Sequence, residues 1–227
     1  MVSRQVILDI GSNHYEFVLK DNPPFARPFT YLSSHCMLTS ILFYELYTRI
    51  DLRSKDNIFS MKELIYGVLH HDDGKNTEEW QQWLIKNNRT NWTNYRDHAD
   101  DRLFDPELHN EEERQLNAFG IPTNKNEELA KWIMRNHHPR KQLDGLSLRL
   151  ERILIVLADH ISANIEAIQS IESIVLNVGN FLSGKTDDTR KWLYGHLSAY
   201  YHPKLAQLLD PIDIVVEVIP KMEENIF

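Results

Sequence analysis

The segment HHDDGK, His70–Lys75, constrains this chain most, because it directly follows a run of apolar residues. The apolar positions of that run recur at helical spacing and are Leu64, Ile65, Val68 and Leu69. The pattern predicts a buried helix over Met61–Leu69, ended where Gly74 allows the backbone to turn without a Cβ penalty. A His followed by an Asp places an imidazole nitrogen and a carboxylate oxygen at one helix end, and this pair can chelate a divalent cation. Burying both groups is costly unless a partner such as a metal ion satisfies them.

Size and composition favour a single domain over residues 1–227, with 42% hydrophobic residues to form its core. Cys36 is the only cysteine, which excludes a disulfide framework and a thiolate zinc site. It also favours a reducing, cytoplasmic location. No apolar stretch has the length of a membrane span and the N-terminal residues lack a signal-peptide pattern, so we expect no membrane partner.

Charge and histidine content narrow the chemistry. The formal net charge of −8 argues against a protein that coats nucleic acid by bulk electrostatics, but a nuclease whose acidic residues are partly metal ligands remains compatible with it. The chain has 11 histidines. Imidazole combined with carboxylate suits Mn, Fe, Co or Ni better than it suits Mg or Ca, which prefer all-oxygen sites.

The order of predicted elements indicates an all-α fold, a helical bundle with a small N-terminal β-hairpin. Alternating apolar residues predict the hairpin over Gln5–Lys20, and a proline-rich connector leads to residue 28. Residues 30–168 form the expected core of the metal site, with predicted helices over Thr30–Ile50, Met61–Leu69, Thr77–Ile85, Asp105–Gly120, Asn126–His138 and Leu146–Ile168. Residues 171–227 predict further amphipathic helices over Ile171–Phe181, Asp188–Leu209 and Ile212–Met222.

Histidines and aspartates recur within these predicted helices at positions that suit metal ligands. Asp159 follows a buried apolar run and therefore needs a partner. His109 shares a helix face with Leu116 and Phe119, so we expect it to point inward. A lone inward histidine is more often a hydrogen-bonded core residue than a ligand. The combination is more specific, and in chain order it comprises His35, His71, Asp72, His109, His137, His138 and Asp159.

This combination resembles the HD-domain metal phosphohydrolase superfamily, whose pattern is a His, then His-Asp, then a late Asp on a long helix. Within that superfamily the chain is most similar to the HD nuclease of CRISPR interference systems. Three segments carry the resemblance, HDDGKNTEEWQ (residues 71–81), HHP (residues 137–139) and ADHISAN (residues 158–164). It spans His35 to Asn164, and the hairpin and the C-terminal third lie outside it.

The resemblance implies an HD-domain bundle with two metal ions. One ion would be held by His35, His71, Asp72 and Asp159, and the other by His137, His138 and an intermediate histidine, with Asp72 bridging the two. Two candidates remain for the intermediate histidine. His109 has the better helix geometry and is slightly favoured, whereas His98, in DHADD, is more similar to the family's His-Ala phrase and closer to the His-Asp pair.

The resemblance also assigns catalytic roles to Asp72 and Lys75. Lys75 matches the family's lysine, which would stabilise a phosphate oxygen, or else it is a solvated cation. His70 is interpreted as structural. Two metal ions would clamp the scissile phosphate and lower the pKa of a water molecule, so no covalent nucleophile is required.

The activity implied by the resemblance is hydrolysis of single-stranded DNA in CRISPR antiviral defence, as an exonuclease or an endonuclease, with RNA as a lesser alternative. A helicase subunit or an RNA-guided effector complex would supply specificity, because the chain has no ATPase motif. Trp92 and Tyr95 are candidates for stacking on bases. A cluster of basic residues is a candidate track for the phosphate backbone of a nucleic acid, and it comprises Lys131, Arg135, Arg140, Lys141, Arg149 and Arg152. The alternative is an ordinary solvated helix face.

Two other functions stay open at this point. The first is an HD phosphohydrolase of nucleotides or cyclic nucleotides, which activity on a small phosphodiester without polymer cleavage would indicate. The second is a non-catalytic HD subunit that docks a partner. Neither the native metal nor the polarity of digestion follows from the sequence.

Overall fold

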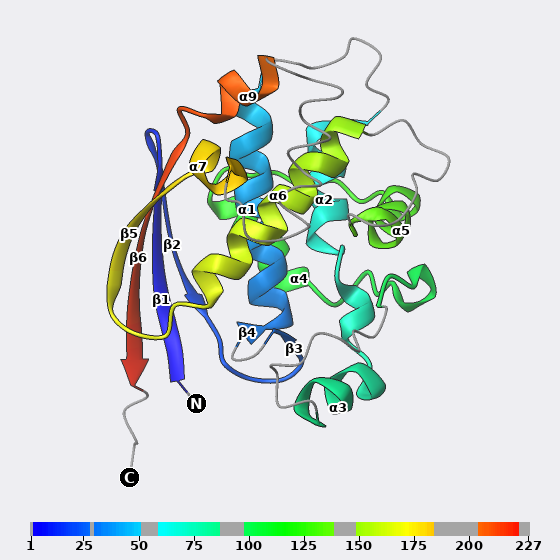
Figure 1. Ribbon diagram of the computed structural model, residues 1–227. Coiled ribbons are helices and arrows are strands. Elements are labelled where there is room, and N and C mark those ends of the chain that lie inside the picture. The colour runs from blue at the N-terminus through cyan, green and yellow to red at the C-terminus, as the bar shows by residue number, and fades with distance from the viewer. Residues whose placement is uncertain are drawn as a thin grey trace.

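The computed structural model describes residues 2–27, 30–50, 59–86, 98–138, 149–183 and 204–222 (Figure 1). A four-stranded sheet forms one side of the molecule, and the long helices α1 and α6 lie between that sheet and helices α2 and α5. In chain order the elements are β1 (Val2–Ile10), β2 (Asn13–Leu19), β3 (Phe25–Arg27), β4 (Thr30–Tyr31), α1 (Leu32–Arg49), α2 (Met61–Leu69), η1 (Asp73–Lys75), α3 (Glu78–Lys86), η3 (Asp101–Leu103), α4 (Asn110–Ala118), α5 (Glu127–Asn136), α6 (Arg149–Glu166), β5 (Glu172–Asn177), α7 (Val178–Ser183), α9 (Lys204–Leu209) and β6 (Asp213–Met222).

The main sheet is antiparallel in the order β2-β1-β6-β5. The first and last strands of the described chain are therefore neighbours, with Val2 opposite Met222 and Ile10 opposite Ile214. Alternate side chains face the helices, as the two-residue period of a strand requires. The buried apolar positions of β1 and β6 are Val6, Leu8, Ile10, Ile214, Val216 and Val218.

The prediction of an all-α fold is wrong, because the C-terminal third completes a β-sheet. The hairpin over residues 5–20 is confirmed, but β5 and β6 occupy segments predicted as helices over Ile171–Phe181 and Ile212–Met222. Residues 213–218 alternate between exposed and buried, which is the pattern of a strand with one face on a core. Most of the predicted helix over residues 188–209 lies outside the described residues, and α9 is its described part.

The helical predictions before residue 168 are confirmed with shifted ends. Helix α1 is buried along most of its length and packs on both α6 and α2, while α2 packs on α5. The predicted helix starting at Asp105 begins only at Asn110, because Asp105 forms a turn in which its carboxylate accepts a hydrogen bond from the Glu107 N–H (3.0 Å). Sheet and helices share one hydrophobic core.

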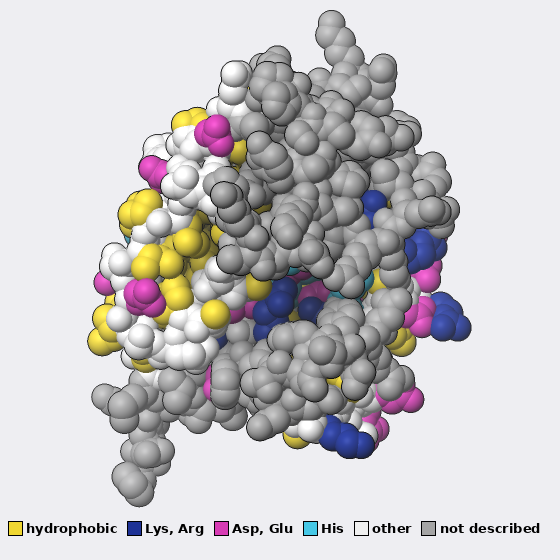
Figure 2. Space-filling model, in the orientation of Figure 1, with side chains coloured by type: hydrophobic (Ala, Val, Ile, Leu, Met, Phe, Trp, Pro, Cys, Tyr) yellow, Lys and Arg dark blue, Asp and Glu magenta, His cyan; other side chains and the backbone are white. Residues whose placement is uncertain are grey.

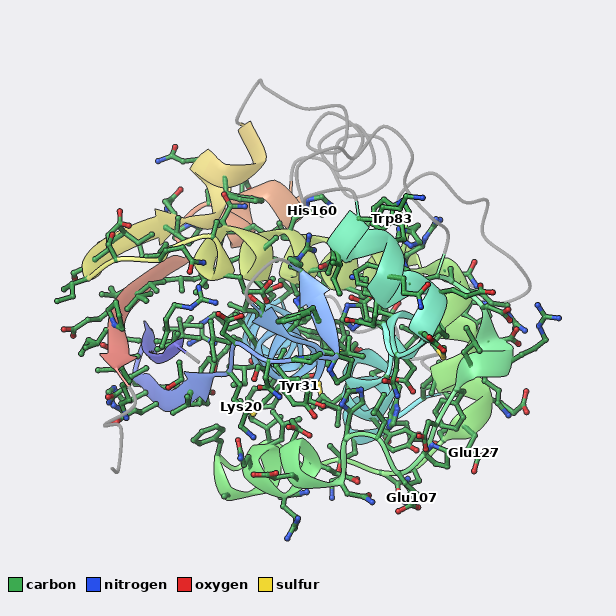
Figure 3. All side chains as sticks on the ribbon, turned by 90° about the horizontal axis from the view of Figure 1, so that it is seen from below. Lys20, Tyr31, Trp83, Glu107, Glu127 and His160 are labelled. Atoms are coloured by element: carbon green, nitrogen blue, oxygen red, sulfur yellow. The ribbon has the colours of Figure 1, made fainter. Side chains whose placement is uncertain are left out.

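Contacts from β1 and from the end of the hairpin attach the sheet to the neighbouring elements. The buried Arg4 of β1 donates to the Ile168 carbonyl (2.8 Å), just after the end of α6. Lys20 follows β2, and its Nζ lies 5.7 Å from the ring centroid of Tyr31 (Figure 3). Within the described ranges, none of the helices combines the length and hydropathy needed to cross a bilayer.

The position of β6 generates a stability prediction with a matched control on the same strand. Val216 is fully buried whereas the neighbouring Val215 is 38% exposed. We expect Val216→Ala to lower the free energy of unfolding by about 2 kcal/mol, through lost burial and a small cavity. Val215→Ala should cost less than about 1 kcal/mol. Urea unfolding of both variants measures the difference, and equal costs would contradict the placement of β6 on the core.

Candidate metal centre

The structure brings together side chains from five separate segments of the chain. His35 comes from α1, the His71-Asp72 pair from the turn after α2, and Asp159 from α6. Three groups within the described residues have ligand atoms close enough to hold a metal ion, with the atoms of each group within 4.8 Å of one another. Two of the three lie around Asp72, namely His35 with His71 and Asp72, and His98 with His137 and His138.

Asp72 joins these two groups. Its Oδ2 lies 3.1 Å from Nε2 of His35 and 3.6 Å from Nε2 of His71. Its Oδ1 lies 2.7 Å from Nε2 of His98 and 3.4 Å from Nε2 of His137. One carboxylate oxygen therefore faces each group, which is the arrangement required of a carboxylate that bridges two cations.

Backbone carbonyls fix the histidine rings that face Asp72. Nδ1 of His71 donates to the Val68 carbonyl (2.7 Å), and Nδ1 of His137 donates to the Met134 carbonyl (2.8 Å). Each hydrogen bond leaves Nε2 of that ring as the atom with a free lone pair. In this tautomer, Nε2 of His71 and Nε2 of His137 can each bind a metal ion.

Unsatisfied nitrogens at the same place indicate a missing partner. Nε2 of His35 and Nε2 of His71 are buried and have no aligned hydrogen bond within the described residues. Buried polar atoms without a hydrogen bond are rare and costly. A metal ion is the partner that several imidazole nitrogens around one carboxylate can share, so the residues present fit a bound cation.

Burial and neighbouring charges shift the pKa values of these histidines in opposite directions in the metal-free protein. Desolvation lowers the pKa of His71 to about 3, and burial next to the Lys75 ammonium lowers the pKa of His98 to about 4. Burial also disfavours the charged form of His35, but the nearby carboxylates, Glu166 foremost, outweigh it and raise its pKa to about 10. At neutral pH His71 and His98 are therefore neutral, whereas the His35 ring is protonated at both nitrogens and positively charged.

Lys75 is buried against Asp72 rather than exposed to solvent. Its Nζ donates to Asp72 Oδ2 and lies 5.5 Å from the ring centroid of Trp80. Although burial would raise the pKa of Asp72, the Lys75 ammonium holds it well below its usual range. The structure thus places Lys75 as the residue that keeps Asp72 ionised, and the predicted contact with a phosphate oxygen stays a prediction.

Gly74 has a different role from the one expected. It does not adopt a positive φ, unlike Gly11 and Gly120. Instead, a Cβ at Gly74 would lie 1.9 Å from the backbone oxygen of His98. The glycine therefore allows the segment that carries His98 to pack directly on the turn that carries Asp72.

The two candidates for the intermediate histidine lie in different clusters. His98 is in the group with His137 and His138, whereas His109 joins Asp73 and His70. Nε2 of His109 lies 2.9 Å from one oxygen of Asp73, and Nδ1 of His70 lies 2.8 Å from the other. Geometry therefore selects His98, although His109 points inward as expected.

The Asp73 cluster has the side-chain types of a metal site, but hydrogen bonds already satisfy it. Besides the two histidines, Asp73 accepts from the Asp105 N–H (3.2 Å), and Nδ1 of His109 lies 3.0 Å from the Ser33 hydroxyl. None of these atoms is among the unsatisfied buried ones. We interpret the cluster as a structural network, in agreement with the structural role expected for His70.

Arg27 and Glu166 lie near the site and were not predicted to do so; both contact predicted ligands. Asp159 Oδ1 lies 3.4 Å from Nε2 of His35 and accepts a hydrogen bond from Arg27 Nη2 at 2.6 Å. Glu166 Oε1 accepts from Nδ1 of His35 at 2.7 Å, which orients that ring. Glu166 follows Asp159 by two helical turns and shares its face, a signal that could have found it, whereas Arg27 lies in the proline-rich connector and has no such signal.

The described members of the predicted phosphate track make contacts within the protein. Arg152 is buried and donates to the carbonyls of Asn136 and His138, both at 2.6 Å, so it holds the turn that presents the paired histidines. Arg135 pairs with Asp101 at 2.6 Å, and Lys131 lies 3.7 Å from Glu127. The remaining candidates for nucleic-acid contact have side chains outside the described residues, namely Trp92, Tyr95, Arg140, Lys141 and Arg149.

Comparison with known proteins adds no relative, since the chain matches no family model, no curated protein and no solved structure. The function is therefore argued from the geometry of the site.

Two adjacent aspartates provide a sharp test of the metal centre. Asp72 faces the unsatisfied histidines and Asp73 lies in the satisfied network. We expect Asp72→Asn to weaken Mn²⁺ binding by more than about 100-fold, since loss of a mere supporting partner already costs about 10- to 100-fold. Asp73→Asn should keep the Mn²⁺ stoichiometry while lowering the melting temperature. Calorimetric titration measures Mn²⁺ binding in the two variants, and thermal unfolding measures their melting temperatures. Equal loss of Mn²⁺ binding in the two variants would contradict the assignment.

The raised pKa of His35 predicts proton release on metal binding. A ligating Nε2 must be free of its proton, and with a pKa of about 10 the ring is protonated at pH 8 in the metal-free protein. Ordinary histidines are neutral at this pH. We therefore expect about one proton to be released when the His35 group binds Mn²⁺, measured by titration calorimetry in buffers of different ionisation enthalpy.

The control for this measurement is Glu166→Gln, which removes the carboxylate that contributes most to the raised pKa of His35. The released fraction should fall in this variant. Binding of Mn²⁺ to the wild-type protein without proton release at pH 8 would contradict the proposed ligation by His35.

Proposed function

We propose that this protein is a metal-dependent phosphodiester hydrolase. The observation that supports it is the Asp72 carboxylate, whose two oxygens face two groups of histidines, one of which contains the unsatisfied Nε2 atoms of His35 and His71. Two cation positions that share one carboxylate suit phosphoester hydrolysis. The imidazole-rich ligand set favours a transition metal such as Mn, Ni, Co or Fe over Mg.

The chain's own residues prepare this site for two cations and an anionic substrate. His71 and His98 are neutral donors because burial lowers their pKa, and Asp72 stays ionised beside Lys75. Bound cations would polarise a phosphoryl oxygen and lower the pKa of a water molecule. His35 and Asp72 are buried, but the Asp159 side chain is 18% exposed, so the site opens to solvent on the α6 side.

We further propose single-stranded DNA as the substrate, in CRISPR antiviral defence. The support is the resemblance of residues 71–81, 137–139 and 158–164 to HD nucleases, together with two contacts between these segments: His137 lies next to Asp72, and Nε2 of His35 lies next to both Asp72 and Asp159. A helicase subunit or RNA-guided complex would then deliver the unpaired strand.

End-labelled single-stranded DNA provides the test. The protein is incubated with Mn²⁺, Ni²⁺ or Mg²⁺ next to a double variant in which His71 and Asp72 are both Ala, and next to Asp73→Asn as the control. We expect metal-dependent cutting by the wild type and by Asp73→Asn, and none by the double variant. The product ladder distinguishes digestion from an end from internal cutting.

Two outcomes would overturn parts of the proposal. Hydrolysis of bis(p-nitrophenyl) phosphate or a cyclic nucleotide by a metal-loaded protein that leaves DNA and RNA intact would move the substrate to small nucleotides. A metal-loaded wild type that hydrolyses none of these phosphodiesters would exclude autonomous catalysis and favour a non-catalytic subunit.

A further inference from the structure

Arg27 of β3 lies at the open side of the metal centre. Its Nη2 donates to Asp159 Oδ1 (2.6 Å), and its Nε lies 3.3 Å from Glu166 Oε2. The side chain is 23% exposed, in contrast to Lys75, whose side chain is 6% exposed. Figure 2 shows atoms of Lys or Arg, Asp or Glu, and His side chains close together near the middle of the face that it draws.

The guanidinium of Arg27 is only partly used. Nη2 has a hydrogen bond, Nε has an ionic contact without an aligned hydrogen bond, and Nη1 has no protein partner within the described ranges. An arginine that served only to neutralise two carboxylates could be fully enclosed by them. Here a donor edge remains available beside a candidate metal ligand.

We propose that Arg27 binds the phosphate group of the substrate, an inference that rests on the proposed function. Guanidinium groups recognise phosphate oxygens through paired N–H donors, and they stay charged in any protein environment. Arg27 reaches Asp159 and Glu166 from a different element than any of the metal ligands. Asp159 has a second neighbour in His35, so a cation at that position would compete with Arg27 for the carboxylate.

Glu166 then has two functions at once. It orients His35 through Nδ1 and holds Arg27 near the site through its other oxygen. If Asp159 were a ligand of a cation, Arg27 would keep its contact with Glu166 and its Nη2 would become free to donate elsewhere. A phosphate oxygen is the group that this nitrogen and Nη1 can both reach.

The test uses thymidine 5′-monophosphate as the probe and the Mn²⁺-loaded full chain. Arg27→Ala removes the guanidinium group, and Arg27→Lys keeps the positive charge without the paired N–H donors of the guanidinium. The matched control is Arg102→Ala, because Arg102 is also paired with a carboxylate, Asp100, but is exposed at the surface. Calorimetry measures the Mn²⁺ stoichiometry first and the nucleotide affinity second.

We expect all variants to bind the wild-type amount of Mn²⁺. The affinity for the nucleotide should fall about tenfold or more in Arg27→Ala, as expected for the loss of a hydrogen bond to a charged group, and by less in Arg27→Lys. It should not change in Arg102→Ala. Should the wild type cleave DNA, KM should rise more than kcat falls in Arg27→Ala.

The outcomes separate this inference from the proposed function. A metal-loaded Arg27→Ala variant with wild-type nucleotide affinity would overturn the role of Arg27 in phosphate binding. Loss of Mn²⁺ from both Arg27 variants would overturn it too, because Arg27 would then only support Asp159. If Arg27 is required for nucleotide binding but the wild type hydrolyses no phosphodiester, the proposed function fails while this inference stands.

Discussion

The structure depends on how a buried carboxylate, Asp72, is kept ionised. An isolated charge is expensive to remove from water, and Asp72 is 1% exposed. Lys75 supplies one compensating charge from the next turn, and imidazole nitrogens surround both oxygens. The protein therefore concentrates carboxylate oxygens and imidazole nitrogens at one interior point, and these groups could hold a metal ion.

The fold holds these groups in place through contacts that begin far from Asp72. Arg4 in the sheet donates to the backbone at the end of α6, the side chain of Glu166 orients His35, and Arg152 holds the turn at His138. Each of these side chains is itself buried and hydrogen-bonded. Sheet and helices thus contribute to one rigid setting for the ligands, and positioning of this kind is what ligation and phosphoryl transfer require.

Sequence reasoning located His71 and Asp72 because a His-Asp pair at the end of an apolar helix needs a partner, whatever the rest of the fold. It slightly favoured His109 over His98, because an inward direction does not tell which side chains share the interior. His109 does point inward, but toward Asp73. Arg27 and Glu166 become neighbours only when β3 and α6 meet. The strand β6 was predicted as a helix because its partner β1 lies about two hundred residues earlier.

The pairing of β1 with β6 has a consequence for the order of events during synthesis. Because β6 lies between β1 and β5, the sheet cannot form until the last described strand has left the ribosome, whereas the helices up to α6 are complete much earlier. Pairing over such a separation in sequence is slow to form. The nascent chain must therefore keep the edge of β1 that pairs with β6 without its partner strand for most of translation, a period in which a chaperone would protect this edge from aggregation.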